Sequence, residues 1–495
     1  MGTVIRQATL NALLSYLGIA LGFVNVVVLY PKVLATEEFG LTRLLLSVAT
    51  MAAQVAQLGA ENTIIRYFPY FRDRERAHRG MLSGILLFAL ATGLFSMVLL
   101  WLGHPWLTSV FADRNALYGQ LGLLVLPLVF SEIVFILLRS YSRALHRTVQ
   151  PTFLREFVLR IGQTALIAWQ AFDPLPFRLF LLLYVGVFLI TTLALAADLW
   201  HKGHLMLGWR QRWWPRRLRR SMVLYSGFTL SASLAGMVLG NMDQLMIGAL
   251  LGRDALTAVA HYAVAFYFGS VIATPGRALT QAAVPHLADA WRRKDHSAIT
   301  SMYERSSFMM LLVSGLFYLL LWAASDLFFT FLPADYAHAA HISLIIGMAY
   351  LLTSAIGLSV GIISMSKAYR LDAWSSLSML VINVVANFFL VRSMGIEGAA
   401  WATLLSLVSV NAYRTWFLWK RYRLWPWSRR SAWAMAAIAG ALIAMWLLPS
   451  TGSVWGDVVL RLVAATAVML PLVGCTGVVA ELRGMVGRGS VGKHR

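Results

Sequence analysis

The sequence predicts an all-α polytopic membrane protein with about 14 transmembrane helices. Of its 495 residues, 59% are hydrophobic and only 13% are charged, whereas a soluble domain carries about 25% charged residues. Apolar runs of about 20 residues recur along the whole chain, and each can cross a bilayer as a helix. Lys and Arg gather in alternate connections between these runs, which is typical of cytoplasmic loops.

The charge pattern sets the orientation of the predicted spans. One alternate set of connections holds 34 of the 42 Lys and Arg residues and the other set holds 7, while Arg160 lies inside a span. Cytoplasmic loops carry the excess, so we expect an even number of spans and cytoplasmic termini. The predicted spans are residues 10–34, 41–65, 80–103, 116–138, 152–171, 178–198, 223–251, 256–276, 306–325, 339–365, 372–391, 396–419, 431–449 and 458–480.

Residues 11–75 and 227–291 share one plan, offset by 216 positions. In each, two apolar spans flank an acidic hinge, Thr36-Glu37-Glu38 in the first copy and Gly252-Arg253-Asp254 in the second. Six spans separate the copies, and an even number preserves orientation, so we expect two parallel repeats. The predicted domains are a six-helix lobe (1–200), a basic cytoplasmic interfacial linker (201–220), a second six-helix lobe (221–420) and a two-helix segment with a cytoplasmic tail (421–495).

The remaining composition excludes several classes of protein. The net charge of +21 is spread over loops between spans, which argues against a nucleic-acid partner. The one cysteine, Cys475, cannot form an intramolecular disulfide. No cleavable signal is expected before the first span. Trp and Arg within 204–220 suit a headgroup layer, although a merely topogenic loop is an equal alternative.

Polar residues form stripes on several predicted spans. Spacings of three and four residues place them on one helix face, and buried ionisable groups in a bilayer usually face a bundle interior or a wet cavity. Helix packing is an equal alternative for the Asn and Ser positions. The stripes comprise Asn11, Ser15, Gly18, Gly22 and Asn25; Gln54, Gln57 and Glu61; Glu156, Arg160 and Gln163; Ser226, Thr229, Ser233, Gly240, Asn241 and Asp243; and Asn383 and Asn387.

Two ionisable residues stand out by their depth. Arg160 lies roughly 12 Å into its span at the rise of an α-helix, and Asp243 is the only acid well inside the seventh span. Because ionisable residues deep within a span are costly, we predict a functional role for both. Arg66, Arg139 and Arg277 lie at cytoplasmic ends, where long side chains also snorkel to the interface.

Several short motifs carry a resemblance to a known family. They are Gly2-Thr3, Thr36-Glu37-Glu38-Phe39-Gly40, Asn241-Met242-Asp243-Gln244-Leu245-Met246-Ile247-Gly248, Leu251-Gly252, Tyr262-Ala263 and Met394-Gly395-Ile396-Glu397-Gly398-Ala399-Ala400-Trp401-Ala402-Thr403. In their order and spacing, the chain resembles the polysaccharide flippases of the multidrug/oligosaccharidyl-lipid/polysaccharide exporter superfamily over essentially its whole length.

This resemblance implies a flippase that moves an undecaprenyl-pyrophosphate-linked oligosaccharide from the cytoplasmic to the outer leaflet of a bacterial inner membrane. It implies two lobes in a V shape that alternate access. The expected state is a monomer in the bilayer without cofactor or metal, with Na⁺ or H⁺ coupling left open. Other polysaccharide assembly proteins are further candidate partners.

For such a substrate, polar residues within the spans and at their cytoplasmic ends supply two sets of candidate residues. The predicted substrate-binding residues are Arg160, Arg66, Arg139, Arg277, Gln57, Gln163, Asn25 and Asn241; the predicted coupling or gating residues are Asp243, Glu61, Glu132 and Glu156. Glu156 can hold Arg160 at i,i+4 spacing until a pyrophosphate displaces it, or the two can form a permanent structural pair. Glu61 and Arg277 occupy equivalent repeat positions and are predicted to pair.

Three other functions remain as alternatives. A cation-coupled multidrug exporter of the same superfamily would favour acids and aromatics, whereas this chain places several arginines in its spans. A membrane-embedded polysaccharide polymerase or glycosyltransferase would need a catalytic outer loop, and neither HExxH, CxxC nor a phosphate-binding glycine loop occurs. A structural scaffold would have little reason to keep Arg160 in hydrocarbon.

Overall fold

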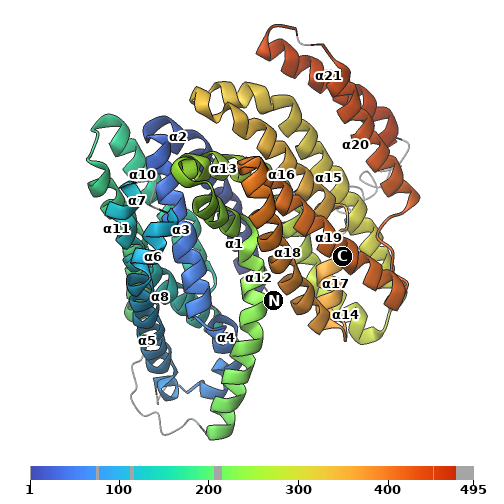
Figure 1. Ribbon diagram of the computed structural model, residues 1–495. Helices are drawn as coiled ribbons and strands as arrows, with labels where there is room; N and C mark the ends of the chain where they lie inside the picture. The colour runs from blue at the N-terminus through green and yellow to red at the C-terminus, as the bar shows by residue number, and fades with distance from the viewer. Residues whose placement is uncertain (1, 74–76, 112–115, 206–214, 450, 475–495) are drawn as a thin grey trace. The chain divides into compact units, whose positions relative to one another are not determined.

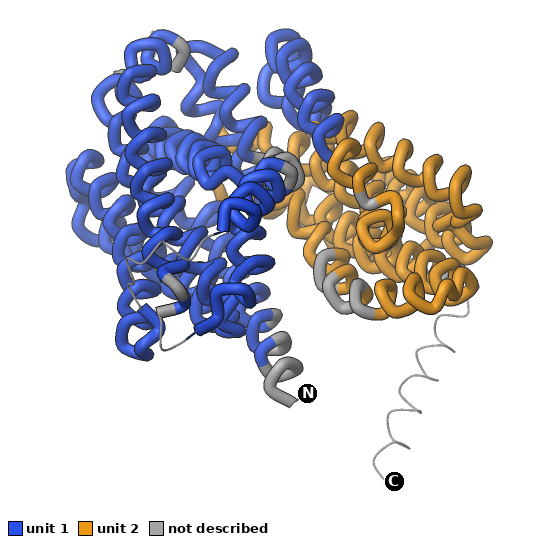
Figure 2. The backbone as a smooth tube through the Cα atoms, turned by 90° about the horizontal axis from the view of Figure 1, so that it is seen from below, with its two compact units in different colours: residues 1–267, 376–402 blue, residues 268–375, 403–495 orange. Residues whose placement is uncertain are grey.

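The computed structural model describes residues 2–73, 77–111, 116–205, 215–449 and 451–474, which are helices joined by short connections (Figure 1). No strand occurs in these ranges. Contacts divide the chain into two compact units, Met1–Tyr267 with Ser376–Ala402 and Phe268–Ser375 with Thr403–Arg495 (Figure 2). This division follows packing rather than sequence duplication, so the predicted repeats and domain boundaries stay predictions.

Unit 1 is organised around one helix, α8. It packs against α3, α4, α5 and α11, and α12 covers α3 and α4. The elements of this unit are α1 (Gly2–Phe23), η1 (Val24–Leu29), α2 (Tyr30–Val33), α3 (Thr36–Ala56), α4 (Ala60–Phe71), η2 (Ala77–Gly80), α5 (Met81–Leu102), α6 (His104–Phe111), α7 (Ala116–Leu121), η3 (Gly122–Leu124), α8 (Val125–Ala144), α9 (Val149–Phe153), η4 (Leu154–Val158), α10 (Leu159–Phe172), α11 (Phe177–His201), α12 (Arg216–Leu250), η6 (Gly252–Asp254) and most of α13 (Ala255–Ser270).

Unit 2 is organised around the long helix α15, which packs against α14, α16, α20 and α21. Two helices cross between the units: α18 enters unit 1 at Ser376, and α19 leaves it after Ala402. The elements are η7 (Val271–Ala273), α14 (Thr274–Arg293), α15 (His296–Thr330), η8 (Ala334–His338), α16 (Ala339–Ser354), α17 (Ser359–Met365), α18 (Tyr369–Met394), α19 (Ile396–Tyr422), α20 (Arg429–Leu447) and α21 (Val454–Gly474).

The multi-pass helical membrane fold is confirmed. Eleven helical segments in the described part of the chain are long and apolar enough to cross a bilayer, and they coincide with eleven of the predicted spans. The other three, 152–171, 223–251 and 396–419, are also helical. They are the spans that carry Arg160, Asp243 and Arg414. The full count of fourteen and the orientation of the termini stay predictions.

Both predicted acidic hinges occur. The chain is extended at Leu34, and α3 begins at Thr36 with Glu37 and Glu38 in its first turn, where negative charge is favourable. The Ala35 N–H donates to Glu38 Oε2 at 3.3 Å. In the second copy, Gly252 has a φ of +67° and opens the short turn η6 that ends at Asp254.

The second predicted span, 41–65, is interrupted. Helix α3 ends at Ala56 and α4 begins at Ala60, because Leu58 and Gly59 adopt left-handed conformations with φ of +49° and +75°. A Cβ atom at position 59 would collide with the Ser226 carbonyl oxygen on α12. Glycine therefore permits both the turn and the close contact. Apolar periodicity continues through the break, so it could not reveal it.

The predicted linker, 201–220, includes the beginning of a long helix. Arg216–Arg220 already form the first turn and a half of α12, a helix of 35 residues. Residues 206–214, which include Trp209, Arg210, Arg212, Trp213 and Trp214, lie outside the described residues.

Candidate functional site

The candidate site is centred on Arg160 in unit 1. Its Nη1 donates to the Tyr267 hydroxyl on α13 at 2.7 Å, and its Nη2 donates to Glu156 Oε2 at 3.1 Å. The Arg160 side chain is 22% exposed. Its Nε is buried without a hydrogen-bond partner among the described residues. The guanidinium is therefore half paired and keeps a donor for a further acceptor.

Helix α1 makes room for this guanidinium. Cβ atoms at Gly18 and Gly22 would run into the Glu156 side chain and into the Arg160 guanidinium, respectively. Asn25 Nδ2 donates to the Arg160 carbonyl oxygen at 3.0 Å, and Thr164 Oγ1 donates to Asn25 Oδ1 at 2.8 Å. The predicted polar face of the first span thus faces the helix that carries Arg160, and Asn25 binds the two helices together.

Both helices depart from α-geometry beside the site. Residues Val24–Leu29 and Leu154–Val158 are π-helical, and each contacts the opposite helix: α1 meets η4, and α10 meets η1. Short π-helical insertions recur at functional sites because they re-aim side chains within an otherwise regular helix. Here Asn25 lies within η1, and η4 ends two residues before Arg160.

A second charged group joins α4 to the C-terminal end of α8. Glu61 Oε1 accepts from Arg139 Nη2 at 2.9 Å and from Arg143 Nη1 at 3.4 Å. Gln57 is fully buried; its Oε1 accepts from the Glu61 N–H, and its Nε2 lacks a partner among the described residues. The predicted partner of Glu61, Arg277, has a side chain outside the described part, so that pairing stays a prediction.

Three further predicted residues have defined surroundings. The Arg66 guanidinium stacks over the ring of Tyr225, 4.2 Å from its centroid, and is otherwise exposed. Asn241 Oδ1 accepts weakly from Ser47 Oγ on α3, at 3.4 Å. Gln163, one turn beyond Arg160, is partly buried and makes no hydrogen bond with the residues described.

Glu132 belongs to a separate buried pair. Its two carboxylate oxygens accept from Arg155 Nη1 and Nη2 at 2.7 and 3.1 Å, and Glu132 is only 3% exposed. The Arg155 guanidinium also lies 5.4 Å from the Phe135 ring centroid and 5.6 Å from that of Phe188. This bidentate arrangement is typical of a fixed helix contact.

Asp243 is fully buried within unit 1 and strongly hydrogen-bonded. Tyr262 Oη donates to Oδ2 at 2.5 Å, while Asn387 Nδ2 and Asn383 Nδ2 donate to Oδ1 at 2.8 and 3.2 Å. The amide oxygens of both asparagines are buried without a donor among the described residues. These hydrogen bonds come from α13 and α18.

The sequence analysis missed several contributing residues. Tyr267 gave no signal, because a tyrosine in an apolar helix is unremarkable. The charge count places Arg155 with the connections, although it lies at the start of the predicted span 152–171 and an acid buried in a span, Glu132, requires a cationic partner. The charge count also places Arg414 with a connection, yet α19 extends to Tyr422 and buries it. Its Nη2 lies 2.9 Å from Asp372 Oδ1 and its Nε 3.0 Å from Ser375 Oγ.

Comparison with known proteins identifies the family. The family described as "Polysaccharide biosynthesis protein" matches residues 4–291, more than half of the chain. No curated protein matches the sequence. Among solved structures, lipid II flippase MurJ in an inward closed conformation is similar with a TM-score of 0.73 and 10% identity, over 95% of this chain and 99% of that one.

Two multidrug transporters share the fold at lower similarity. An inward-facing MATE family multidrug resistance transporter of the MOP superfamily has a TM-score of 0.60 and 15% identity, over 85% of this chain and 97% of that one. A mutant of the Vibrio cholerae MATE transporter VcmN has a TM-score of 0.54 and 13% identity, over 85% of this chain and 98% of that one. The chain therefore belongs to the polysaccharide biosynthesis protein family and has the transporter fold seen in MurJ and the MATE exporters.

Proposed function

We propose that this protein is a flippase for an undecaprenyl-pyrophosphate-linked oligosaccharide in a bacterial inner membrane. It moves the lipid from the cytoplasmic to the outer leaflet by alternating access, with both termini cytoplasmic. Family membership and the MurJ-like fold support a lipid-linked saccharide as substrate. The Lys and Arg pattern supports the orientation.

The half-paired guanidinium of Arg160 carries the proposal. A pyrophosphate offers several anionic oxygens, and a planar guanidinium binds two of them at once. Among the residues that the structure describes, the buried Nε of Arg160 has no partner and its Nη2 is bonded to Glu156 alone. An arriving pyrophosphate competes with Glu156 for this nitrogen. Release of Glu156 would alter the contact between η4 and α1, where Gly18 lies against that carboxylate.

The pairing of the acidic side chains with arginines also separates this proposal from multidrug export. A cavity for organic cations needs exposed acids, whereas Glu156, Glu61 and Glu132 are each paired with arginine. We expect purified protein to bind undecaprenyl pyrophosphate and to ignore an organic cation such as ethidium. Tight ethidium binding without pyrophosphate binding would support the exporter instead.

Arg160 variants test the role directly in proteoliposomes with a fluorescent lipid-linked oligosaccharide. Arg160→Ala should weaken pyrophosphate binding about tenfold or more, since a charge-assisted hydrogen bond is lost. Arg160→Lys should also fail because lysine cannot reproduce the fork. Arg178→Lys, at an exposed position on α11, is the matched control. Normal transport by Arg160→Lys would favour a structural Glu156–Arg160 pair, and normal transport by Arg160→Ala would reject the proposal.

We further propose Asp243 as the coupling acid. Its carboxylate and the amide oxygens of Asn383 and Asn387 are the oxygen atoms that Na⁺ prefers, and a proton on Asp243 is the simpler alternative. The donor-free amide oxygens fit a cation, because their amides can turn toward one bound beside the carboxylate. Within the described residues, no group of three or more His, Cys, Asp or Glu suits a metal ion. We propose a monovalent ion or a proton as the ligand.

A further inference from the structure

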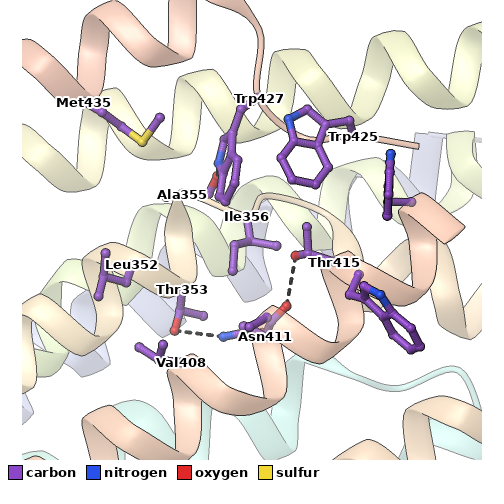
Figure 3. Close-up of a pocket in the computed structure, with 13 residues that line it drawn as sticks. Leu352, Thr353, Ala355, Ile356, Val408, Asn411, Thr415, Trp425, Trp427 and Met435 are labelled. Carbon is purple, nitrogen blue, oxygen red and sulfur yellow. Dashed lines mark hydrogen bonds between the residues drawn. The ribbon is translucent and has the colours of Figure 1, made fainter. Parts of the chain in front are cut away.

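Unit 2 contains a tryptophan-rich cavity of about 880 Å³ (Figure 3). It lies among α16, the C-terminal half of α19, the connection 423–428 and α20, and its volume is in the range of roughly 300–1,000 Å³ that is usual for ligand sites. The lining residues are Leu352, Thr353, Ala355, Ile356, Val408, Asn411, Ala412, Thr415, Trp416, Trp419, Trp425, Trp427 and Met435.

The interior of the cavity is suited to an apolar chain. Its polar groups bond to one another: Asn411 Nδ2 donates to Thr353 Oγ1 at 3.1 Å, and Thr415 Oγ1 donates to the Asn411 carbonyl oxygen at 2.9 Å (Figure 3). Aliphatic and aromatic side chains make up the remaining wall. A polar occupant would find few partners there, whereas a hydrocarbon chain loses nothing by entering.

The wall formed by the connection after α19 is fixed in place. Arg423 has a φ of +58° and turns the chain, and Leu424 beside it is only 1% exposed. Trp427 Nε1 donates to the Ala355 carbonyl oxygen at 2.8 Å. Trp425 packs edge-on against Trp427, with ring centroids 5.1 Å apart. The cavity is therefore formed by packed and hydrogen-bonded groups.

Three tryptophans that line the cavity are also exposed at the protein surface. Trp416, Trp419 and Trp425 are 47%, 45% and 42% exposed. Their indole N–H groups form no hydrogen bond with the residues that the structure describes. Tryptophan concentrates where hydrocarbon meets headgroups, because the ring is apolar and the N–H needs an acceptor. Ester and phosphate oxygens of a lipid supply such acceptors.

Basic residues lie next to these tryptophans in the sequence. Arg421, Arg423 and Arg429 are exposed and form no ion pair within the described ranges, and Lys420 lies over the Trp416 ring with Nζ 4.9 Å from the centroid. They flank the end of α19 and the start of α20. Basic pockets between transmembrane helices on the cytoplasmic side bind the headgroups of anionic lipids.

We propose that this cavity binds an anionic phospholipid of the surrounding bilayer. An acyl chain occupies the tryptophan-lined interior, and the phosphate lies at Arg421, Arg423 and Arg429. The site belongs entirely to unit 2, whereas Arg160 belongs to unit 1, so this inference does not depend on the proposed transport substrate. The charge pattern places it in the cytoplasmic leaflet, where anionic lipids are enriched.

Native mass spectrometry of the full-length protein in detergent tests the proposal, with phosphatidylglycerol and phosphatidylcholine as probes. We expect the wild type to prefer phosphatidylglycerol. Arg421→Gln with Arg423→Gln should weaken that binding by about thirtyfold and leave phosphatidylcholine unaffected. Arg305→Gln, at an exposed position on α15, is the matched charge control.

A cavity-filling variant tests the acyl-chain site separately. Ala412→Phe should remove one phosphatidylglycerol binding event, while Ala439→Phe, at an exposed position of α20 that does not line the cavity, should not. Equal affinity for both lipids, or unchanged binding in both the arginine and Ala412→Phe variants, would overturn the proposal. Displacement of phosphatidylglycerol by undecaprenyl phosphate at stoichiometric concentration would assign the cavity to the transported lipid and also overturn it.

Discussion

Gly22 of α1 lies directly against the guanidinium of Arg160, at a distance where any side chain would overlap Nη1. Gly18, one turn earlier, stands in the same relation to Glu156. The glycines of the first predicted span therefore leave the space that the arginine of the fifth span occupies. This arrangement links the small residues of α1 to the chemistry of α10.

We expect Gly22→Leu to displace the Arg160 guanidinium and to abolish transport. The added side chain must occupy the space that Nη1 fills, and α1 cannot move away while Asn25 binds the Arg160 carbonyl. Transport of the lipid-linked oligosaccharide in proteoliposomes gives the readout. Ala20→Leu, at an exposed position two residues earlier on α1, is the control. Full transport by Gly22→Leu in a well-folded protein would show that Arg160 need not keep this position.

Replacing Asp243 by Asn should remove ion or proton dependence with little change in shape. The amide keeps hydrogen-bonding capacity toward Tyr262 and Asn387 but lacks the charge, so it cannot bias the transporter by differential cation affinity. Transport should be measured over a range of pH and Na⁺ concentration. Tyr262→Phe, which removes one donor and keeps the carboxylate, should retain the dependence. Wild-type behaviour of Asp243→Asn under all conditions would exclude the coupling role.

Glu61 should couple energetically to Arg139. The two side chains are 2.9 Å apart, and one partner left alone costs more than removal of both. Hence Glu61→Gln with Arg139→Gln should regain part of the stability or transport lost in each single variant. Glu61→Gln with Arg277→Gln tests the pairing predicted from the repeat. Additive losses in the first cycle and recovery only in the second would assign Glu61 to Arg277.

Glu132 should contribute mainly to stability. Breaking its buried bidentate pair leaves Arg155 without its carboxylate, which costs about 3 kcal/mol in the free energy of unfolding. Denaturant unfolding in detergent should show this loss for Glu132→Gln and a smaller one for Glu132→Gln with Arg155→Gln. An unchanged stability together with lost transport would instead support the predicted gating role.

Membrane topology can be checked by cysteine labelling in a Cys475→Ser background. The Lys and Arg distribution predicts that Asp335 and Ser453 lie outside and Ser297 in the cytoplasm. A membrane-impermeant thiol reagent added to intact cells should label cysteines at the first two positions. Labelling of Ser297→Cys from the outside would contradict the orientation.

Hydrophobicity and charge distribution were enough to predict the fold class, the helical segments and the two acidic hinges. Both patterns reflect the bilayer, which acts on each span separately. They can therefore be recognised in the sequence without knowledge of tertiary contacts. The same local spacing placed Glu156 and Arg160 on one face, and their ion pair follows from that spacing. It also placed Gly18, Gly22 and Asn25 on the face that meets α10.

The contacts between polar groups of distant segments became visible only in the folded chain. Asp243 is bonded to Asn383 and Asn387, more than a hundred residues away, and Arg160 reaches Tyr267 on α13. The close approach of α12 likewise requires a glycine at position 59, where α3 gives way to α4. No periodicity records such contacts, because each depends on how helices far apart in the chain pack together rather than on the helix that carries the residue.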